Sequence, residues 1–340
     1  VKFDAQSESL SLNSTDMDID IVETVPAAVE TSGSTTAPAH TLFDIVRQLP
    51  EGSQVELDNT EDSQNLVLNS GRSKFTLSCL PTEDFPVLSG DELPHNFELP
   101  AKALRTLIDR TKFAISTEET RYYLNGIYIH VSDVDGMTKL RAVATDGHRL
   151  AKVEVDCPQG AESMPGVIVP RKAVTELRKL AEQFGENILV SVSDTRIRFS
   201  FDGVVFTTKL IDGTFPDYGR VIPTGNDKVL EVNTSDFSEA VSRVSAISSD
   251  KSRAIKLGLT AGNLLLSVIS TENGSAVEEL GVDYSADGVE IGFNSRYLLD
   301  ITQQIEGDLA RFTLADSASP TLVQDTSDDT TLYVLMPMRV

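Results

Sequence analysis

The sequence is poor in the residue types on which thiol and metal chemistry depend. It has two cysteines, Cys79 and Cys157, and four histidines among 340 residues. The cysteines form no CxxC or Cys/His pattern, so we expect two reduced thiols in a cytoplasmic protein. The histidine spacing matches no metal site, and we expect neither a metal nor a cofactor. No apolar run approaches the roughly 18 residues that would cross a bilayer, so the sequence predicts no membrane partner.

Basic residues are also scarce. The chain has 29 lysines and arginines against 52 acidic residues, which is a formal net charge of −23. That balance excludes a uniformly basic coat for nucleic acid. It does not say how the charges are distributed, and the positive side chains could still share one face.

Catalytic motifs are sparse. The chain has no glycine loop of the kind that cradles phosphate, no HExxH and no GxSxG. The string from Thr145 to Leu150 places Asp146 near His148, which leaves an acid/base enzyme as one alternative. Sequence neighbours on a strand or turn do not generally face each other, so a turn with a hydrogen-bonded histidine is the simpler interpretation. We predict no catalytic residues.

Period-two runs that end in turn pairs predict short strands joined by hairpins. One such run, 195–201, is followed by Asp202-Gly203 and a second run, 204–210. Further hairpins are predicted at the turn pairs Asp135-Gly136, Asn273-Gly274 and Asp287-Gly288.

Five segments with apolar residues at helical spacing predict helices. They start near His40, Pro100, Pro170, Ser235 and Asn294. The second helix ends with Ala114-Ile115-Ser116, and the fourth ends with Ala246-Ile247-Ser248, about 130 residues later. The third and fifth each follow a strand, and the first has the same pattern. Ordered matches at a fixed period indicate an internal repeat.

The repeat predicts an α+β fold made of three tandem copies of one unit, each with two helices and two small sheets. We place the copies at residues 1–95, 96–226 and 227–340. The first copy is shorter than the others before its helix, so we expect about 30 N-terminal residues, one strand and one helix, to be absent from it.

The helices of the middle copy are basic. Segments 100–116 and 170–185 hold eight basic residues against Asp109, Glu176 and Glu182, a balance of +5 in a chain of −23. A solvated helix face remains an alternative explanation. In the third copy, Asp300 and Glu306 should balance Arg296, so that copy does not share the bias.

Five strings together resemble the bacterial sliding clamp, the beta subunit of DNA polymerase III. They are Arg121–Gly126, Ala144–Ala151, Val167–Lys172, Phe215–Tyr218 and Met336–Arg339, in the order and spacing of that family. The resemblance covers essentially the whole chain. It implies a head-to-tail homodimer closed into a ring, with sheets outside and helices lining a hole that encloses duplex DNA.

The resemblance implies a non-catalytic clamp that tethers the replicative polymerase for processive synthesis. Phosphate contacts that read no bases permit sliding on any sequence. The remaining alternative is an acidic interaction scaffold that never encloses DNA. The implied partners are double-stranded DNA, the polymerase III alpha subunit, the ATP-dependent clamp loader and other proteins with a clamp-binding motif. The implied DNA-facing residues are Lys102, Arg105, Lys112, Arg121, Tyr122, Tyr123, Arg171 and Lys172.

The resemblance also implies a shared pocket for partner peptides. Methionine suits such a site because its flexible side chain adapts to several partners. The residues carried over are Leu124, Thr145, Gly147, His148, Arg149, Leu150, Pro216, Arg220, Val221, Asn294, Tyr297, Val334, Met336, Pro337, Met338 and Arg339. Two features, at three positions, depart from the family pattern. Ser252 stands where some clamps carry an aromatic residue, and Glu118 with Glu119 makes the loop before Arg121 less favourable for phosphate.

The dimer interface is predicted at a sheet edge in the first copy. The edge strand contains Arg72, Lys74, Phe75 and Leu77, and its partner region in the third copy lies near Ala246 and Ile247. The family's head-to-tail arrangement and the alternation of apolar residues at an unpaired edge support this placement.

Overall fold

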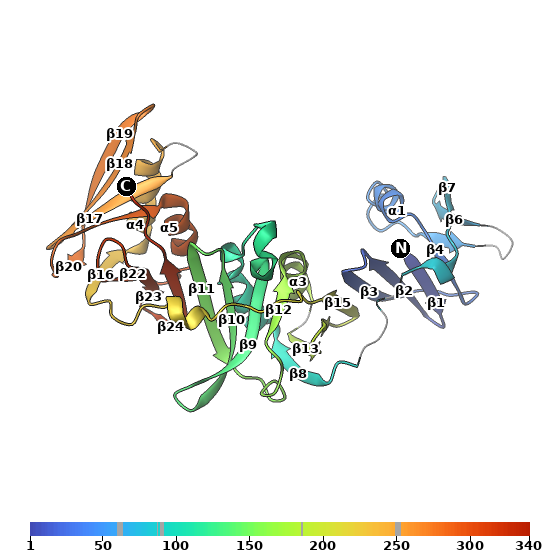
Figure 1. Cartoon of the computed structure of the whole chain (residues 1–340). Helices are drawn as coiled ribbons and strands as arrows, with labels where there is room; N and C mark the ends of the chain where they lie inside the picture. The colour runs from blue at the N-terminus through green and yellow to red at the C-terminus, as the bar shows by residue number, and fades with distance from the viewer. Residues whose placement is uncertain (60–63, 87, 89–91, 185, 249–252) are drawn as a thin grey trace. The chain divides into compact units, whose positions relative to one another are not determined.

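The computed structural model describes residues 1–59, 64–86, 88, 92–184, 186–248 and 253–340. All five predicted helices are present within this part of the chain, but the second and the fourth end earlier than predicted, at Asp109 and Ser245. They are α1 (Ala39–Val46), α2 (Ala101–Asp109), α3 (Arg171–Gln183), α4 (Thr234–Ser245) and α5 (Ser295–Thr302) (Figure 1).

The helix starts follow from local chemistry. A proline precedes each of the first three helices, at Pro38, Pro100 and Pro170, where its missing N–H costs no helical hydrogen bond. The other two begin after asparagines that act as N-caps. Asn233 accepts a hydrogen bond from the Asp236 N–H at 3.0 Å, and Asn294 accepts one from the Arg296 N–H at 3.0 Å.

The described chain divides into two compact units, 1–101 with 183–210, and 102–182 with 211–340. The first unit has an eight-stranded sheet in the order β4-β1-β2-β3-β15-β14-β13-β8 and a three-stranded sheet in the order β5-β6-β7. Its strands are β1 (Lys2–Gln6), β2 (Ser9–Thr15), β3 (Ile19–Pro26), β4 (Gly33–Thr36), β5 (Glu56–Asp58), β6 (Asn65–Ser70), β7 (Ser73–Ser78), β8 (His95–Pro100), β13 (Asn187–Val192), β14 (Arg196–Ser200) and β15 (Val204–Lys209).

The second unit has a nine-stranded sheet in the order β12-β9-β10-β11-β24-β23-β22-β16-β20 and a four-stranded sheet in the order β19-β18-β17-β21. Its strands are β9 (Gly126–Val134), β10 (Met137–Thr145), β11 (Arg149–Asp156), β12 (Val167–Pro170), β16 (Lys228–Asn233), β17 (Ala254–Thr260), β18 (Asn263–Ser270), β19 (Gly274–Gly281), β20 (Asp283–Tyr284), β21 (Val289–Asn294), β22 (Leu309–Leu314), β23 (Thr321–Asp325) and β24 (Asp328–Leu335).

The large sheets are built from smaller groups of strands that join edge to edge. In the first unit β3 pairs with β15, and in the second unit β11 pairs with β24. The middle stretch of the chain therefore supplies one four-stranded group to each large sheet. This arrangement explains why the two compact units divide the middle predicted copy between them, and the boundaries near 95 and 226 stay predictions.

Three of the four predicted hairpins are confirmed. Asp135-Gly136 joins β9 to β10, Asp202-Gly203 joins β14 to β15, and Asn273-Gly274 stands where β18 turns into β19. The prediction for Asp287-Gly288 is wrong. It lies between β20, which pairs with β16, and β21, which pairs with β17, so the turn leads from one sheet to another. A turn pair signals a local change of direction and cannot specify which strand the chain pairs with next.

Buried apolar side chains lie between the helices and the sheets. Phe237, Val241 and Val244 form the buried face of α4, which packs against α5 and against strands of both sheets of the second unit. The ring of Phe237 lies 5.2 Å from that of Phe312 in β22, centroid to centroid. Figure 1 shows α4 and α5 side by side.

Candidate functional site

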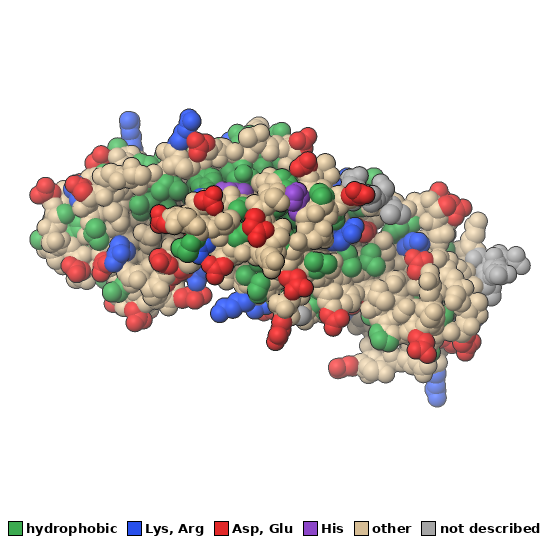
Figure 2. Space-filling model, turned by 90° about the horizontal axis from the view of Figure 1, so that it is seen from below, with side chains coloured by type: hydrophobic (Ala, Val, Ile, Leu, Met, Phe, Trp, Pro, Cys, Tyr) green, Lys and Arg blue, Asp and Glu red, His purple; other side chains and the backbone are tan. Residues whose placement is uncertain are grey.

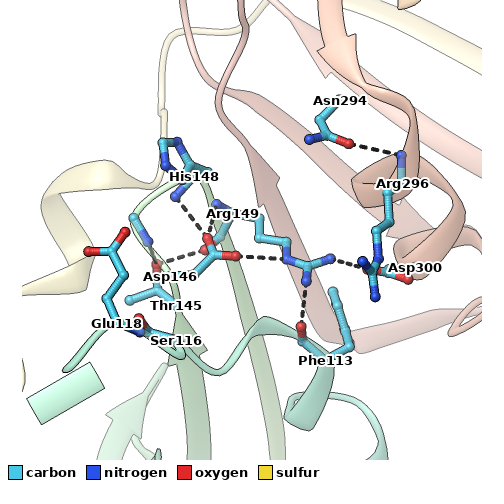
Figure 3. A network of polar contacts seen from close by, with 11 residues as sticks. Phe113, Ser116, Glu118, Thr145, Asp146, His148, Arg149, Asn294, Arg296 and Asp300 are labelled. Atoms are coloured by element: carbon cyan, nitrogen blue, oxygen red, sulfur yellow. Dashed lines mark hydrogen bonds and ion pairs between the residues drawn. The ribbon is translucent and has the colours of Figure 1, made fainter. Parts of the chain in front are cut away.

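A buried arginine occupies the centre of the region where the predicted pocket residues meet. Arg149 starts β11, and its guanidinium reaches three partners from different parts of the second unit (Figure 3). It donates to the Asp146 carboxylate at 3.1 Å, to the Phe113 carbonyl at 2.6 Å and to the carboxylate of Asp300 in α5. Its carbon Cζ also lies 4.3 Å from the ring centroid of Tyr297. A guanidinium has five N–H donors in a fixed fork, so it can join several acceptors rigidly.

This arrangement differs from the role predicted for Asp300. The sequence suggested Arg296 as its partner, but Asp300 binds Arg149, which is 151 residues away along the chain. The side chain of Glu306 likewise pairs with Arg110 at 2.9 Å. Both ion pairs cross between the middle and last predicted copies, and helical spacing carries no information about such contacts.

The Asp146 carboxylate stabilises the turn in which it lies. Its Oδ1 accepts the N–H groups of His148 at 2.9 Å and Arg149 at 3.0 Å, and its Oδ2 accepts the Arg149 guanidinium. The His148 imidazole is exposed and stacks near Tyr297, with ring centroids 6.4 Å apart. The carboxylate of Asp146 is thus engaged by backbone N–H groups and by Arg149 instead of by the His148 ring. This geometry gives the pair no general acid/base relay.

Beneath the turn lies a hydrophobic cluster. It consists of Leu124, Val143, Leu150, Ile168, Phe215 and Val334, all buried. Leu150 in β11 lies opposite Val334 in β24, so the pairing of these strands brings two predicted pocket residues together. Since both side chains are buried, they support the surface from below, and contact with a partner must come from residues above them.

The C-terminal segment is held by two backbone hydrogen bonds. The Met336 N–H donates to the His148 carbonyl, and the Met338 N–H donates to the Gly292 carbonyl, each at 2.9 Å. Gly292 permits the second contact, because a Cβ there would lie 2.5 Å from the Met338 carbonyl oxygen. Met336 remains exposed, while Pro337 and Met338 are half-buried. The tail is thus fixed next to the turn, with apolar side chains still accessible.

The remaining predicted pocket residues lie on the same unit. Pro216, Arg220 and Val221 are exposed on a segment whose neighbours Phe215, Tyr218 and Ile222 pack into or against the cluster. Asn294 caps α5, and Thr145 closes its own turn by donating to the Arg149 carbonyl at 2.7 Å. Arg339 is exposed. Figure 2 shows hydrophobic side chains gathered with histidine on one face, while acidic side chains are scattered around them.

The basic residues of segments 100–116 and 170–185 are mostly paired within the chain. Lys112 contacts Asp109 at 2.6 Å, Arg178 contacts Asp109 at 2.7 Å, and the Arg105 guanidinium donates to the Ala181 carbonyl at 2.6 Å. Lys102 and Arg171 are exposed, and within the described ranges neither side chain has an ion-pair partner. These two residues are therefore the most available for phosphate, whereas Arg105 already holds the two helices together.

The loop before β9 also contains an internal ion pair. Arg121 donates to Glu118 at 2.8 Å, and its guanidinium lies beside Gly147, where a Cβ would clash with Nη1 of Arg121. Gly147 has φ +89°, a left-handed conformation that also favours glycine. Tyr122 is exposed and lies edge-on to Tyr123. Ser252 lies outside the described residues, and Lys172 is exposed on α3.

The predicted interface residues lie near an edge strand of the first unit and at the end of α4 in the second unit. β7 pairs with β6 on one side and ends the three-stranded sheet, and β19 ends the four-stranded sheet in the same way. Phe75 is half-buried, Arg72 and Lys74 are exposed, and Leu77 belongs to the hydrophobic cluster of the first unit. Ala246 caps α4, and the Ile247 carbonyl accepts a hydrogen bond from Asn273.

Sequence reasoning missed several residues that build the site. Asp300, Phe113 and Gly292 contact predicted pocket residues, but each acts through a partner far away in the chain. Of these three residues, only Gly292 could have been noticed in the sequence. A glycine near the end of a strand can mark the close approach of another backbone, but that signal is weak. Within the described ranges, no three or more His, Cys, Asp or Glu side chains are grouped to hold a metal, and no helix is long and apolar enough to cross a membrane.

The repeated sheets and the exposed apolar residues beside a buried arginine define a tandem-repeat α+β protein with a candidate surface for binding partners. Comparison with known proteins identifies the family. The DNA polymerase III beta subunit profiles match in order, the N-terminal domain at residues 1–89, the central domain at 98–217 and the C-terminal domain at 219–339. The chain belongs to this family, the bacterial beta sliding clamps.

Individual relatives agree with this assignment. A beta sliding clamp of Caulobacter vibrioides is 51% identical over 336 residues, which cover 99% of this chain and 90% of the relative. The clamp of Pseudomonas aeruginosa is 41% identical over 98% of this chain and 90% of its own length. A crystal structure of the Bartonella birtlesii clamp bound to griselimycin superposes with a TM-score of 0.96 at 50% identity, covering 100% of this chain and 91% of that one.

The predicted fold class and non-catalytic role are confirmed by these comparisons. The enzyme alternative is wrong, because sliding clamps are processivity factors and the Asp146 carboxylate is committed to its turn. The acidic-scaffold alternative fails with it, since members of this family act on DNA.

Proposed function

We propose that this chain forms a head-to-tail homodimeric ring around duplex DNA and captures partner proteins at the surface around Arg149. As a sliding clamp it tethers the replicative polymerase to DNA and catalyses no reaction itself. Its partners are double-stranded DNA, the polymerase III alpha subunit, the clamp loader and other proteins with a clamp-binding motif. The cytoplasm is the proposed location.

The observation that carries the docking proposal is the way the apolar surface is built. Met336, Val221 and Pro216 are exposed above the buried Leu150 and Val334, and Arg149 is occupied by protein partners on three sides. A ligand site of this kind needs an apolar surface with a few polar groups, and it binds best when its parts are already in place. A Caulobacter crescentus clamp structure 51% identical to this chain holds polyethylene glycol at a region named for tethering the beta motif, which supports such a site.

The resemblance implied that Arg149 belongs to the peptide pocket, but its proposed role is not to bind the peptide directly. A peptide anchor needs free donors, whereas the guanidinium of Arg149 already binds Asp146, Asp300 and the Phe113 carbonyl. We therefore assign peptide anchoring to the exposed His148 and Arg339 and give Arg149 the role of holding the surface in shape.

The test is a truncation that removes Met336 to Val340. Burying a methionine side chain contributes about 1.5–3 kcal/mol, so removing two of them should abolish a micromolar interaction. Binding of a short peptide that ends in apolar side chains is measured by titration, with sizing to follow the oligomer. Met137→Ala is the control, because Met137 is an exposed methionine on the β9–β10 hairpin. Equal peptide affinity in the truncated and parent proteins would show that the docking site lies elsewhere.

A further inference from the structure

The positions of three exposed residues, Pro216, Arg220 and Val221, depend on the contacts that hold their segment in place. The Arg220 guanidinium donates to Asp217, three residues earlier, and this bond does not tie the segment to a sheet. At the two ends of the segment, Phe215 and Ile222 pack on the hydrophobic cluster. Apolar contacts are not directional, so they do not fix the orientation of the segment. Between them, Tyr218 in the 3₁₀ helix η4 (Tyr218–Val221) makes polar contacts with two strands.

The Tyr218 hydroxyl lies between a cation and an imidazole. Arg141 in β10 donates to the Tyr218 Oη at 2.7 Å, and the Oη lies 2.9 Å from Nε2 of His130 in β9. The other nitrogen of His130, Nδ1, lies 2.9 Å from the Val131 carbonyl, which can only accept. Nδ1 of the neutral ring therefore carries the proton, and Nε2 accepts the hydrogen bond from the Tyr218 O–H.

The cation in this chain of contacts is itself fixed. Arg141 binds Glu154 at 2.6 Å, and Lys152 binds the same carboxylate oxygen at 2.8 Å. The side chains of Arg141 and Glu154 are 14% and 12% exposed. Charge-assisted contacts of such low exposure form a rigid support on β10 and β11.

We propose that Tyr218 is a positioning residue for partner docking, whose hydroxyl, held between Arg141 and His130, fixes η4 and with it Pro216, Arg220 and Val221. This proposal rests on the docking function proposed above. It assigns Tyr218, Arg141 and His130 to a role that does not require them to touch the partner.

The geometry makes docking sensitive to acid. A second proton on His130 turns Nε2 into a donor, so the Tyr218 O–H loses its acceptor, and a new cation lies near Arg141. The groups that face His130 are Tyr128 on its own strand, Arg141 on β10, Glu154 on β11 and Tyr218 on η4. Burial lowers the pKa of His130 below its usual 6.5, so the ring is neutral at neutral pH and takes its proton only below that value.

The experiment compares Tyr218→Phe with Tyr284→Phe. The control Tyr284 is buried, and like Tyr218 its hydroxyl donates a hydrogen bond, here to the Asp287 carbonyl, but it lies on β20. Binding of a capped peptide that ends in apolar side chains and has no titratable group is measured by fluorescence anisotropy at about pH 7.5 and at successively lower pH, through the pKa of His130. Hydrogen exchange of the segment 211–224 is measured without peptide.

We expect Tyr218→Phe to weaken binding about tenfold at the higher pH, as the removal of one hydrogen bond to a charged group would. The parent should bind more weakly at the lower pH, and the variant should lose most of that pH dependence. Exchange in 211–224 should rise in Tyr218→Phe only. Unchanged affinity in Tyr218→Phe, or an equal loss in Tyr284→Phe, would overturn the proposal. If the parent binds no peptide, the docking function fails, and the exchange data alone then decide whether Tyr218 positions η4.

Discussion

The two places where groups of strands join into a large sheet are built alike but held differently. Both β3–β15 in the first unit and β11–β24 in the second pair antiparallel over five residues. At β11–β24 the Arg149 guanidinium binds two carboxylates and a carbonyl while only 9% exposed. At β3–β15 the corresponding charges are the exposed pair Lys209–Asp18, 3.2 Å apart, and Asp20, whose Oδ1 is buried without a hydrogen-bond partner in the described chain.

The comparison shows that strand pairing joins the repeats at both junctions, whereas the proposed docking site lies at only one of them. Strand pairing alone is enough to continue the sheet, because every paired residue satisfies its backbone N–H and carbonyl groups. Of the two junctions, the β11–β24 junction also places a buried cation under an exposed apolar surface. The proposed docking surface therefore depends on side chains added to a shared backbone design.

The largest effect is expected where strand edges of two chains should meet. We predict that Ile247→Asp yields monomers, since the change introduces a charge at the proposed contact between the β7 edge of one molecule and the region of Ile247 in another. Sizing at several concentrations measures the outcome. Leu77 is unsuitable for this test because it is buried in its own unit.

Met137→Asp is the matched control, an exposed apolar residue changed to the same charge on a hairpin. A dimer that survives Ile247→Asp undiminished would place the interface elsewhere.

The next largest effect is expected from removing the buried cation at the β11–β24 junction, compared with removing the exposed cation at the β3–β15 junction. Arg149→Ala leaves Asp146, Asp300 and the Phe113 carbonyl without their partner, so the free energy of unfolding should fall by about 3 kcal/mol. Lys209→Ala removes an exposed ion pair and should cost less than about 1 kcal/mol. Denaturant unfolding of both variants gives the two values. Equal decreases would mean that the Arg149 interactions add nothing beyond a surface pair.

A smaller effect is expected from removing two exposed cations, Lys102 and Arg171, that have no ion-pair partner within the described residues. Changing Lys102 and Arg171 to Ala should weaken retention of DNA of any sequence and lower the slope of log affinity against log salt by about 0.9 for each phosphate that is no longer neutralised. Lys179→Ala is the control on α3, because Lys179 is exposed but already paired with Glu176 at 3.0 Å.

DNA retention should be measured on circular and linear duplexes of two unrelated sequences. A decrease confined to one sequence would contradict sliding.

The smallest effect concerns Asp20 at the β3–β15 junction. Burial raises the pKa of Asp20, and contacts with Asn13 and Arg198 offset the shift only in part. A raised carboxyl pKa means that the folded state favours the protonated form, so the ionised side chain lowers stability at neutral pH. Asp20→Asn should therefore stabilise the protein by about 0.5 kcal/mol at neutral pH, after allowance for partial exposure.

The gain should shrink as the pH falls through the pKa of Asp20, because the native carboxyl then becomes neutral as well. Unfolding midpoints across that range measure it. A gain that stays constant down to the lowest pH would exclude the ionised carboxylate as the cause.

Most of the fold could be predicted because its signals are local. The spacing of Leu104, Leu107 and Ile108 suffices to predict α2, and Pro100 marks its start. Asp135-Gly136 predicts its hairpin because both residues adopt positive φ at that turn. Asp287-Gly288 misled the prediction, since a turn pair is indifferent to the sheet in which the next strand pairs.

The site was predictable only as a set of residues. The family resemblance brought Arg149, Tyr297 and Met336 into one group, but it did not reveal that the guanidinium of Arg149 is already occupied. Likewise, the positive charge on α2 and α3 was visible in the sequence, whereas the pairing of Arg178 with Asp109 depends on how the two helices face each other. Contacts of this kind join residues 69 to 151 positions apart.

The sequence by itself determined the five helices, the short strands, the repeat and the family, because periodicity, turn chemistry and ordered motifs act over a few residues at a time. Only the tertiary structure decided that β11 pairs with β24, that Asp300 binds Arg149 and that Tyr218 lies between Arg141 and His130. The physical reason is that a buried charge or hydroxyl takes whichever partner the packed strands bring within about 3 Å, and that choice is made by the whole sheet.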